Sequence, residues 1–228
     1  MKECFVEKKS KSNFNQEKFP DSVLSIEDLT IVRGLKTVLS NFNHTFICKK
    51  LYLLEGNNGV GKSSLLRTIS GLINPFSGLI KWNGLSINKT KKEFVNKINY
   101  IGHSNGLSPI LSVKKNLEYW LSISGNNGNL NNALNTFEIK KFSLTPVIEL
   151  SSGLQRRVAL SRLLLCRKNI WLLDEPLNSI DEENQKIFFE QILNHINNNG
   201  IVIMATHQKV KNIPFKNIKT INLNLRNK

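Results

Sequence analysis

The sequence predicts an α/β fold with a mainly parallel sheet, because short fully apolar runs alternate with amphipathic helical patterns. Runs that are apolar on both faces are typical of strands covered by helices on each side. The apolar runs are residues 51–54, 170–173 and 201–205, and the helical patterns are residues 63–70, 153–167 and 182–197. A chain of 228 residues with 40% hydrophobic residues is long enough for one such domain with a buried core.

The N-terminal part of the chain predicts a tail followed by strands. Residues 1–22 are polar and basic, and we expect a disordered tail there, followed by a single domain over residues 23–228. Residues 23–32 have a strand pattern. Residues 79–82 read as a strand entering a tight Asn83-Gly84 turn, so we also expect a small antiparallel β subdomain.

The middle and the end of the chain predict two further features. Residues 105–165 are dominated by helical patterns around a Gly/Asn-rich stretch, and we interpret them as a helical insert between core strands. The tail beyond residue 209 is basic with an apolar alternation that predicts an edge strand. The alternating residues are Ile218, Ile221, Leu223 and Leu225.

Composition excludes several classes of protein. The three cysteines lack the spacing of a disulfide framework or a zinc site. No apolar run approaches the roughly 20 residues that span a bilayer. The formal net charge of +15 favours contact with polyanions or anionic lipid, or reflects a solvated lysine-rich surface. No basic helix interleaved with aromatic residues stands out, so we expect no direct contact with nucleic acid.

Residues 56–63 carry the most specific motif. They fit G-x-x-x-x-G-K-[ST] between a predicted strand and a predicted helix, which indicates a P-loop NTPase (RecA-like) core. In such a loop, backbone N–H groups and the helix N-terminus surround phosphate oxygens. Lys62 is expected to reach the β- and γ-phosphates, and Ser63 to bind Mg²⁺. The expected nucleotide-binding residues are Gly56, Asn57, Asn58, Gly59, Val60, Gly61, Lys62, Ser63 and Ser64.

A pair of acidic residues follows the apolar run at 170–173. Asp174 comes at the end of this predicted strand, where α/β sheets bind ligands, and we expect it to bind Mg²⁺ together with Ser63. Glu175 comes next and is the candidate base that activates the attacking water. The two motifs together predict a site for nucleotide hydrolysis.

Three further segments resemble one family of P-loop proteins, the ABC ATPases. Residues 150–157 resemble the signature motif LSGGQ, residues 179–181 resemble the D-loop, and His207 follows a predicted strand like the switch histidine. The order and spacing of these motifs cover most of the chain. The resemblance implies an ATPase with ATP and Mg²⁺ as ligands.

The resemblance also implies how the sites are assembled. Each ATP site is shared between two nucleotide-binding subunits, so the partner is a second copy in a homodimer. Ser151 and Gly153 are expected to contact the γ-phosphate of ATP on the opposite subunit, and a helix N-terminus suits this role. Asp181 is expected to act across the same interface, and His207 to sense the γ-phosphate.

Several positions depart from the family pattern. The signature has Ser152 and Leu154 in place of a glycine and a glutamine, and whether Gln155 compensates is open. His103 stands in place of the Q-loop glutamine, where it either bonds a Mg²⁺-bound water or is structural. Arg33 either stacks on the adenine or is a surface residue.

Residues 100–120 and 150–165 resemble a narrower group, the ATP-binding subunits of the cytochrome c maturation haem exporter. This resemblance implies small integral membrane subunits as partners and haem that is handled by the complex rather than bound here. It also implies a peripheral location on the inner membrane, on the matrix side of a mitochondrion or the cytoplasmic side of a bacterium. Abundant Asn, Lys, Ile and Phe suggest an AT-rich genome and favour the mitochondrion.

Three alternatives differ in class. An ABC ATPase for another membrane cargo has the same chemistry, so the chain does not distinguish it. The net charge suggests a nucleic-acid-linked or ribosome-linked ATPase, but those on the ribosome carry two ATPase domains and this chain has one. A non-catalytic relative is disfavoured because Lys62, Asp174, Glu175 and His207 are all present.

Overall fold

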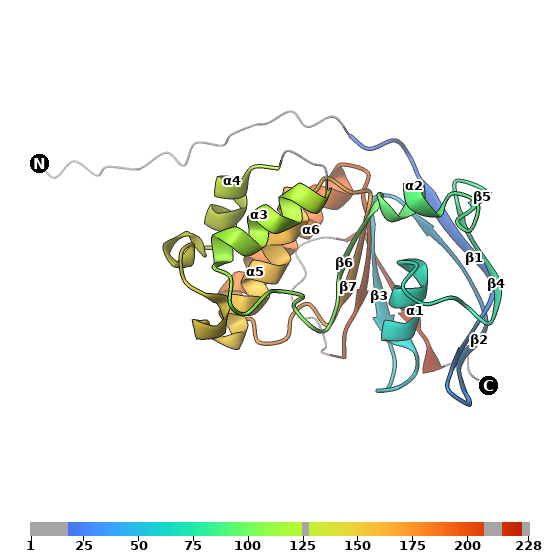
Figure 1. Ribbon diagram of the computed structural model, residues 1–228. Helices are drawn as coiled ribbons and strands as arrows, with labels where there is room; N and C mark the ends of the chain where they lie inside the picture. The colour runs from blue at the N-terminus through green and yellow to red at the C-terminus, as the bar shows by residue number, and fades with distance from the viewer. Residues whose placement is uncertain (1–17, 125–127, 208–215, 225–228) are drawn as a thin grey trace, which may run out of the picture.

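The computed structural model describes residues 18–124, 128–207 and 216–224. Figure 1 shows strands and helices alternating along the chain. The strands are β1 (Val23–Arg33), β2 (Lys36–Ile47), β3 (Lys50–Glu55), β4 (Ser77–Trp82), β5 (Leu85–Ser86), β6 (Ile98–Ile101), β7 (Ile170–Asp174), β8 (Ile201–Ala205) and β9 (Ile218–Asn222). The helices are α1 (Lys62–Ile69), α2 (Lys91–Val95), α3 (Val113–Ser124), α4 (Leu130–Thr136), α5 (Ser152–Leu165) and α6 (Glu182–Asn197), with 3₁₀ turns η1 (Lys140–Phe142) and η2 (Val147–Glu149).

The strands form two sheets. A five-stranded sheet has the order β6-β7-β8-β3-β9, and all its strand pairs are parallel. A four-stranded sheet has the order β2-β1-β4-β5, and its pairs are antiparallel. The predicted α/β fold with a mainly parallel sheet and an antiparallel β subdomain is therefore confirmed.

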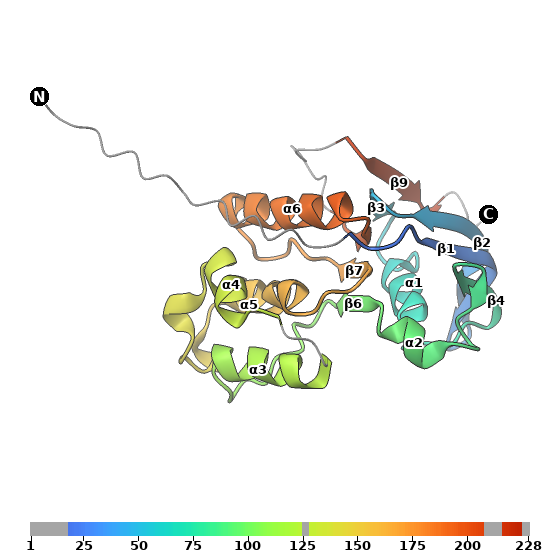
Figure 2. The ribbon, with the colours of Figure 1, turned by 90° about the horizontal axis from the view of Figure 1, so that it is seen from above.

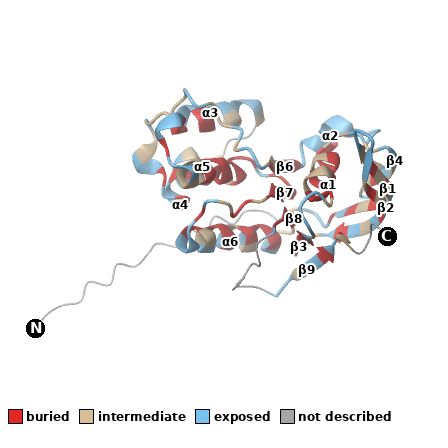
Figure 3. Cartoon of the chain, turned by 90° about the horizontal axis from the view of Figure 1, so that it is seen from below, coloured by how far each residue is buried: buried red, intermediate tan, exposed pale blue. Residues whose placement is uncertain are grey.

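The parallel sheet separates two hydrophobic cores. In Figures 1 and 2, α3 to α6 lie on one side of this sheet, and α1, α2 and the antiparallel sheet lie on the other. Alternate strand residues point to opposite cores: Leu173 and Met204 join the helical side, whereas Leu172 and Ile203 join the α1 side. Every residue of β7 and β8 is buried (Figure 3), which is why these strands read as continuous apolar runs.

The sequence did not predict β2. Its buried residues include Leu39, Phe42 and Phe46, which are spaced three and four apart like one face of a helix. The register between β1 and β2 shifts at several points, and Asn41 has a left-handed φ of 46°. These irregularities break the alternation that would have identified a strand.

Helices α3, α4 and α5 lie within the region that we interpreted as a helical insert. Residues 128–129 separate α3 from α4, and residues 125–127 lie outside the described part of the chain. Buried apolar residues of α3, α4 and α5, among them Leu117, Leu134 and Leu160, belong to the core on the helical side. Within the described residues, no helix is long and apolar enough to cross a membrane.

Both ends of the described chain contact the core. The Phe19 N–H donates to the Asn198 carbonyl oxygen at 3.0 Å, so residues 18–22, which we assigned to the basic tail, lie against the end of α6. Residues 1–17 lie outside the described residues, as does Leu225. Strand β9 pairs with β3 at the margin of the parallel sheet, which confirms the predicted edge strand.

Candidate active site

The loop from Gly56 to Gly61 joins β3 to α1 at the carboxyl end of the parallel sheet. Gly56, Gly59 and Gly61 have φ values of 146°, 81° and 105°, a backbone conformation that side chains disfavour. A Cβ on Gly61 would lie 2.9 Å from the Val38 carbonyl oxygen of β2. Glycine is therefore needed because the antiparallel sheet packs directly against this loop.

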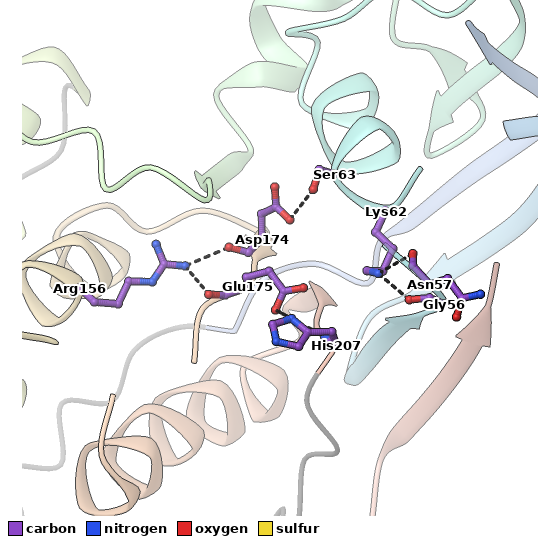
Figure 4. Close-up of polar contacts among 8 residues, drawn as sticks. All are labelled: Gly56, Asn57, Lys62, Ser63, Arg156, Asp174, Glu175 and His207. Carbon is purple, nitrogen blue, oxygen red and sulfur yellow. Dashed lines mark hydrogen bonds and ion pairs between the residues drawn. The ribbon is translucent and has the colours of Figure 1, made fainter. Parts of the chain in front are cut away.

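Lys62 is the first residue of α1, and its side chain curls over the loop. Its Nζ donates to the carbonyl oxygens of Gly56 and Asn57 at 2.6 and 3.2 Å (Figure 4). The Asn57 N–H in turn donates to Oδ1 of Asn224, which follows β9, at 3.0 Å. The edge strand thus helps to hold the loop, a contact that the sequence did not reveal.

Asp174 lies at the carboxyl end of β7 and faces Ser63. The Ser63 hydroxyl donates to Oδ1 of Asp174 at 2.8 Å, as Figure 4 shows. Asp174 is 1% exposed, and its Oδ2 is buried without a hydrogen-bond partner among the described residues. Burial raises the pKa of this carboxyl, and the hydrogen bond from Ser63 opposes the rise.

The residues around Asp174 fit a magnesium ion. An unpartnered carboxylate oxygen beside a hydroxyl presents the hard oxygen ligands that Mg²⁺ prefers. A bound cation would also stabilise the buried charge on Asp174. The structure therefore brings Ser63 and Asp174 together as the sequence predicted for a metal site.

Glu175 and His207 form a polar pair beyond the same edge of the sheet. His207 Nδ1 lies 2.9 Å from Oε2 of Glu175, and the two side chains are 51% and 14% exposed. Glu175 has a left-handed φ of 51°, and its N–H donates to the Ala205 carbonyl oxygen at 2.9 Å. The neighbouring strands β7 and β8 thus present the acid and the histidine to each other.

His103 and Arg33 occupy different surroundings. His103 is exposed in the segment after β6, and its electrostatic interaction lowers the pKa of Asp174. The structure thus places His103 within the electrostatic reach of the predicted metal ligand. Arg33 is exposed at the end of β1, opposite Lys36 on β2. It lies on the hairpin whose second strand abuts the P-loop.

The signature residues lie at the start of α5. Ser151 caps this helix, and its hydroxyl accepts a hydrogen bond from the Leu154 N–H at 3.3 Å. A Cβ on Gly153 would lie 2.5 Å from the Ser179 carbonyl oxygen, so glycine permits the D-loop to approach. Asp181 caps α6 by accepting from the Asn184 N–H at 2.9 Å.

The signature helix and the P-loop helix lie apart. In Figures 1 and 2, α5 and α1 lie on opposite sides of the parallel strands. The structure therefore brings Ser151 and Gly153 next to the D-loop, and it brings Ser63, Asp174, Glu175 and His207 together at the edge of the sheet. It does not bring the two groups to one place within a single chain.

Gln155 contacts the turn that precedes its own helix. Its Nε2 donates to the carbonyl oxygens of Val147 and Leu150 at 3.1 and 3.0 Å. The amide group therefore holds the turn before α5. Leu154, at that position, packs against the hydrophobic core of the helical side.

Sequence reasoning missed Arg156, which lies on the buried face of α5. Its guanidinium donates to the carbonyl oxygens of Asp174 and Glu175, both at 2.9 Å (Figure 4). In the sequence it falls within the signature-like residues 150–157, on a helical face that is apolar apart from Ser161 and Arg162. That position does not show which element the side chain contacts.

Comparisons with known proteins identify the family. The family model described as "ABC transporter" matches residues 39–178. The cytochrome c biogenesis ATP-binding export protein CcmA of Vibrio vulnificus is 36% identical over 189 residues, which cover 82% of this chain and 92% of the relative. The protein of the same name from Haemophilus influenzae is 32% identical over 210 residues, with 90% and 97% covered. These relatives are bacterial and give no support to the expected mitochondrial location.

Solved structures agree with this result. A putative ABC transporter ATP-binding protein from Pyrococcus furiosus has a TM-score of 0.76 and 30% identity, and the match covers 90% of this chain and 98% of that one. A dimeric ATP-binding cassette bound to ADP and phosphate has a TM-score of 0.72 at 22% identity, which supports the fold. With its P-loop, its acidic strand end and these relatives, the chain belongs to the ABC transporter family as an ATPase subunit.

Proposed function

We propose that this chain hydrolyses ATP in the complex that exports or releases haem during cytochrome c maturation. The observation that carries the enzymatic part is the cluster of Ser63, Asp174, Glu175 and His207 at one edge of the parallel sheet. The haem-related part is supported by the relatives named cytochrome c biogenesis ATP-binding export protein. Their match extends over most of both chains.

The phosphate-binding part of the proposal follows from the P-loop. Lys62 lies over the loop through its hydrogen bonds to Gly56 and Asn57, and its ammonium group binds the phosphates. The N-terminus of α1 adds free N–H groups and a partial positive charge. Ser63 and Asp174 would hold the Mg²⁺ ion, which would supply positive charge beside the phosphate oxygens.

The hydrolytic step depends on Glu175 and His207. Glu175 accepts a proton from the attacking water as general base, and it directly follows the proposed metal ligand Asp174 at the end of β7. His207 contacts Glu175 through Nδ1 and holds the carboxylate in place. His103 lies close enough to influence Asp174, and we assign it to the water shell of the metal.

The assembly follows from the separation of α5 and α1. Because the signature of one chain does not meet its own P-loop, a second copy supplies Ser151 and Gly153 to the ATP. Asp181 then lies at the interface between the two copies. Small integral membrane subunits bind this dimer on the cytoplasmic face of the inner membrane, or on the matrix face in a mitochondrion.

The substitution Glu175→Gln tests the catalytic assignment. We expect ATP to bind with little change while hydrolysis falls by at least about 100-fold, because a general base contributes roughly 10² to 10⁴. The variant should then accumulate as an ATP-bound dimer in size-exclusion chromatography with light scattering. Lys62→Ala, which removes phosphate contacts, should neither bind ATP tightly nor dimerise. Hydrolysis by Glu175→Gln at the wild-type rate would contradict the assignment of the base.

Copurification tests the assignment to haem export. The full-length chain, tagged and expressed in its native membrane, should copurify with small integral membrane subunits, and addition of haem should change the ATPase rate of that complex. An ATPase for another membrane cargo would copurify with other membrane subunits and give a rate that haem does not change.

A further inference from the structure

The middle of α5 carries a buried cation that the proposed reaction does not use. Arg156 is 3% exposed. Its guanidinium lies beneath the carboxyl end of β7, pointing at the main chain of Asp174 and Glu175 (Figure 4). A guanidinium has five N–H donors in a rigid plane. Each donor of Arg156 has an acceptor within 3.2 Å.

Three of these contacts surround the proposed base. One terminal nitrogen, Nη2, donates to the carbonyl oxygens of Asp174 and Glu175, both at 2.9 Å. Nε donates to the Pro176 carbonyl oxygen at 3.2 Å. Glu175 has the left-handed φ of 51°, a conformation that is strained for residues other than glycine. By donating to the carbonyl oxygens of Glu175 and of the residues before and after it, the Arg156 guanidinium thus holds this backbone in its strained conformation.

The other contacts reach the segment that carries His103. The second terminal nitrogen, Nη1, donates to the Gly102 carbonyl oxygen at 2.9 Å and to Oδ1 of Asn105 at 3.1 Å. Gly102 precedes His103, whose electrostatic interaction lowers the pKa of Asp174. One side chain therefore ties the segment after β6 to the strand end that bears the metal ligand and the base.

The chemistry of the site requires arginine. Burial lowers the pKa of Arg156 to about 10, and the charges of Asp174 and Glu175 oppose that change, so the group stays protonated at neutral pH. A lysine ammonium has three donors on a flexible stem and no planar fork. It keeps the charge but does not bridge both segments.

A second buried arginine on α5 offers a comparison. Arg162 donates to the Ala159 carbonyl oxygen of its own helix at 3.1 Å and lies over the ring of Trp120, 4.3 Å from its centroid. It also reaches the Gly106 carbonyl oxygen at 3.4 Å. These contacts of Arg162 are with α3, with α5 and with Gly106 in the segment after β6, and none is with the end of β7. Arg162 therefore serves as a control for simply perturbing the buried face of α5.

We propose that Arg156 is a positioning residue for ATP hydrolysis. It holds Glu175 in its left-handed conformation and locks it to the segment 102–105, so that the base and the His103 segment move together. Through this link, displacement of the His103 segment by a partner changes the position of the base. The inference rests on the proposed function, because it assigns a support to the base of that reaction.

The variants Arg156→Lys and Arg156→Met in the full-length chain test the proposal. We expect kcat for ATP to fall about 10- to 100-fold, because a misplacement of about 1 Å at a reacting group can have that effect. The KM for ATP and the Kd of Mg²⁺–ATP should change less than about 3-fold, because none of the Arg156 hydrogen bonds goes to the P-loop. Arg156→Lys should retain more activity than Arg156→Met. Arg162→Lys should lower the melting temperature while kcat stays near the wild-type value.

A gentler variant covers the case in which Arg156→Met does not fold. Asn105→Ala removes one acceptor from a partly exposed side chain. It should lower kcat a few-fold at unchanged Kd, and the double variant Arg156→Lys with Asn105→Ala should be no slower than Arg156→Lys alone. Hydrogen exchange of residues 102–105 should increase in each of these variants.

Three results would overturn the inference. They are a folded Arg156→Lys with wild-type kcat, a parallel loss of ATP binding and kcat, and additive effects of the two substitutions in the double variant. Failure of the proposed function looks different, because the wild-type chain would then hydrolyse ATP no faster than Lys62→Ala.

Discussion

Single residues in this protein hold charges where solvent does not reach them. Asp174 keeps a carboxylate at 1% exposure with one oxygen unpartnered among the described residues. Burial raises its pKa, so ionisation of this group opposes folding until a cation binds. The buried carboxylate therefore lowers the free energy of unfolding of the metal-free protein, and it provides an oxygen ligand for a cation.

The substitution Asp174→Asn tests whether the buried carboxylate lowers the stability of the protein. The raised pKa means that the folded state binds the proton more tightly than the unfolded state, so Asp174 lowers stability as pH rises above its ordinary pKa. The neutral amide should therefore raise the free energy of unfolding at pH 7 in EDTA, measured by urea denaturation, and the gain should vanish at pH 3. The variant should lose stabilisation by Mg²⁺–ATP.

The control is Asp181, a carboxylate whose pKa is lowered and not raised in the folded protein. Hydrogen bonds from Asn184 lower the pKa of Asp181, so Asp181→Asn should give no gain at pH 7. An unchanged or lower stability of Asp174→Asn in EDTA would show that desolvation of the carboxylate is not the dominant effect.

On the helical side, residues for which we propose an interface role also make structural contacts. Gln155 holds the turn before α5, Gly153 admits Ser179, and Asp181 caps α6. Helix ends carry unsatisfied N–H groups, so a cap and an anion-binding site draw on the same atoms. When a substitution at such a position lowers activity, the stability of the variant must also be measured to separate the two roles.

Substitutions at Asp181 separate the two roles. Asp181→Ala should lower the free energy of unfolding by about 1 kcal/mol, the usual effect of losing an N-cap. Asp181→Ser should restore that stability, since serine caps a helix about as well. If Asp181 acts across the dimer interface, both variants should lose ATPase activity. Recovery of activity together with stability in Asp181→Ser would confine the residue to capping.

At the scale of the whole molecule, the buried His195 packs three parts of the chain together: α6, β7 and the N-terminal segment. His195 of α6 stacks on Trp171 of β7 with ring centroids 4.0 Å apart, and it contacts Phe19 of the N-terminal segment at 5.7 Å. Its Nε2 lies 3.2 Å from the Asn169 carbonyl oxygen. Burial lowers its pKa to about 3, so the ring is neutral in the folded protein.

Acid should therefore destabilise the fold through His195. Because its pKa is lower in the folded state than the ordinary 6.5, the unfolded state binds the proton first, and stability is lost as pH falls from about 6.5 towards 3. His195→Gln should reduce this dependence by at most about 1.4 kcal/mol per pH unit, measured by urea unfolding between pH 7 and 4. Equal slopes for His195→Gln and the wild type would contradict this origin.

The sequence by itself determined the fold class, the P-loop and the acidic strand end. These features are local: β7 and β8 are buried on both faces and read as apolar runs, and the phosphate loop needs glycines and Lys62 at set spacing. The strand end at Asp174 follows from the same pattern. Features of this kind depend on residues that are close together in the sequence, so the sequence is enough to predict them.

Only the tertiary structure decided the rest. Strand β2 escaped prediction because its bulged register with β1 gives Leu39, Phe42 and Phe46 a helical spacing. Gln155 and Arg156 are neighbours in the sequence but bind different elements. Gln155 donates a hydrogen bond to the turn before α5, whereas Arg156 donates to the end of β7. Hydrogen-bond partners far apart in sequence are set by the packing of whole elements, and a pattern along the chain contains no record of that packing.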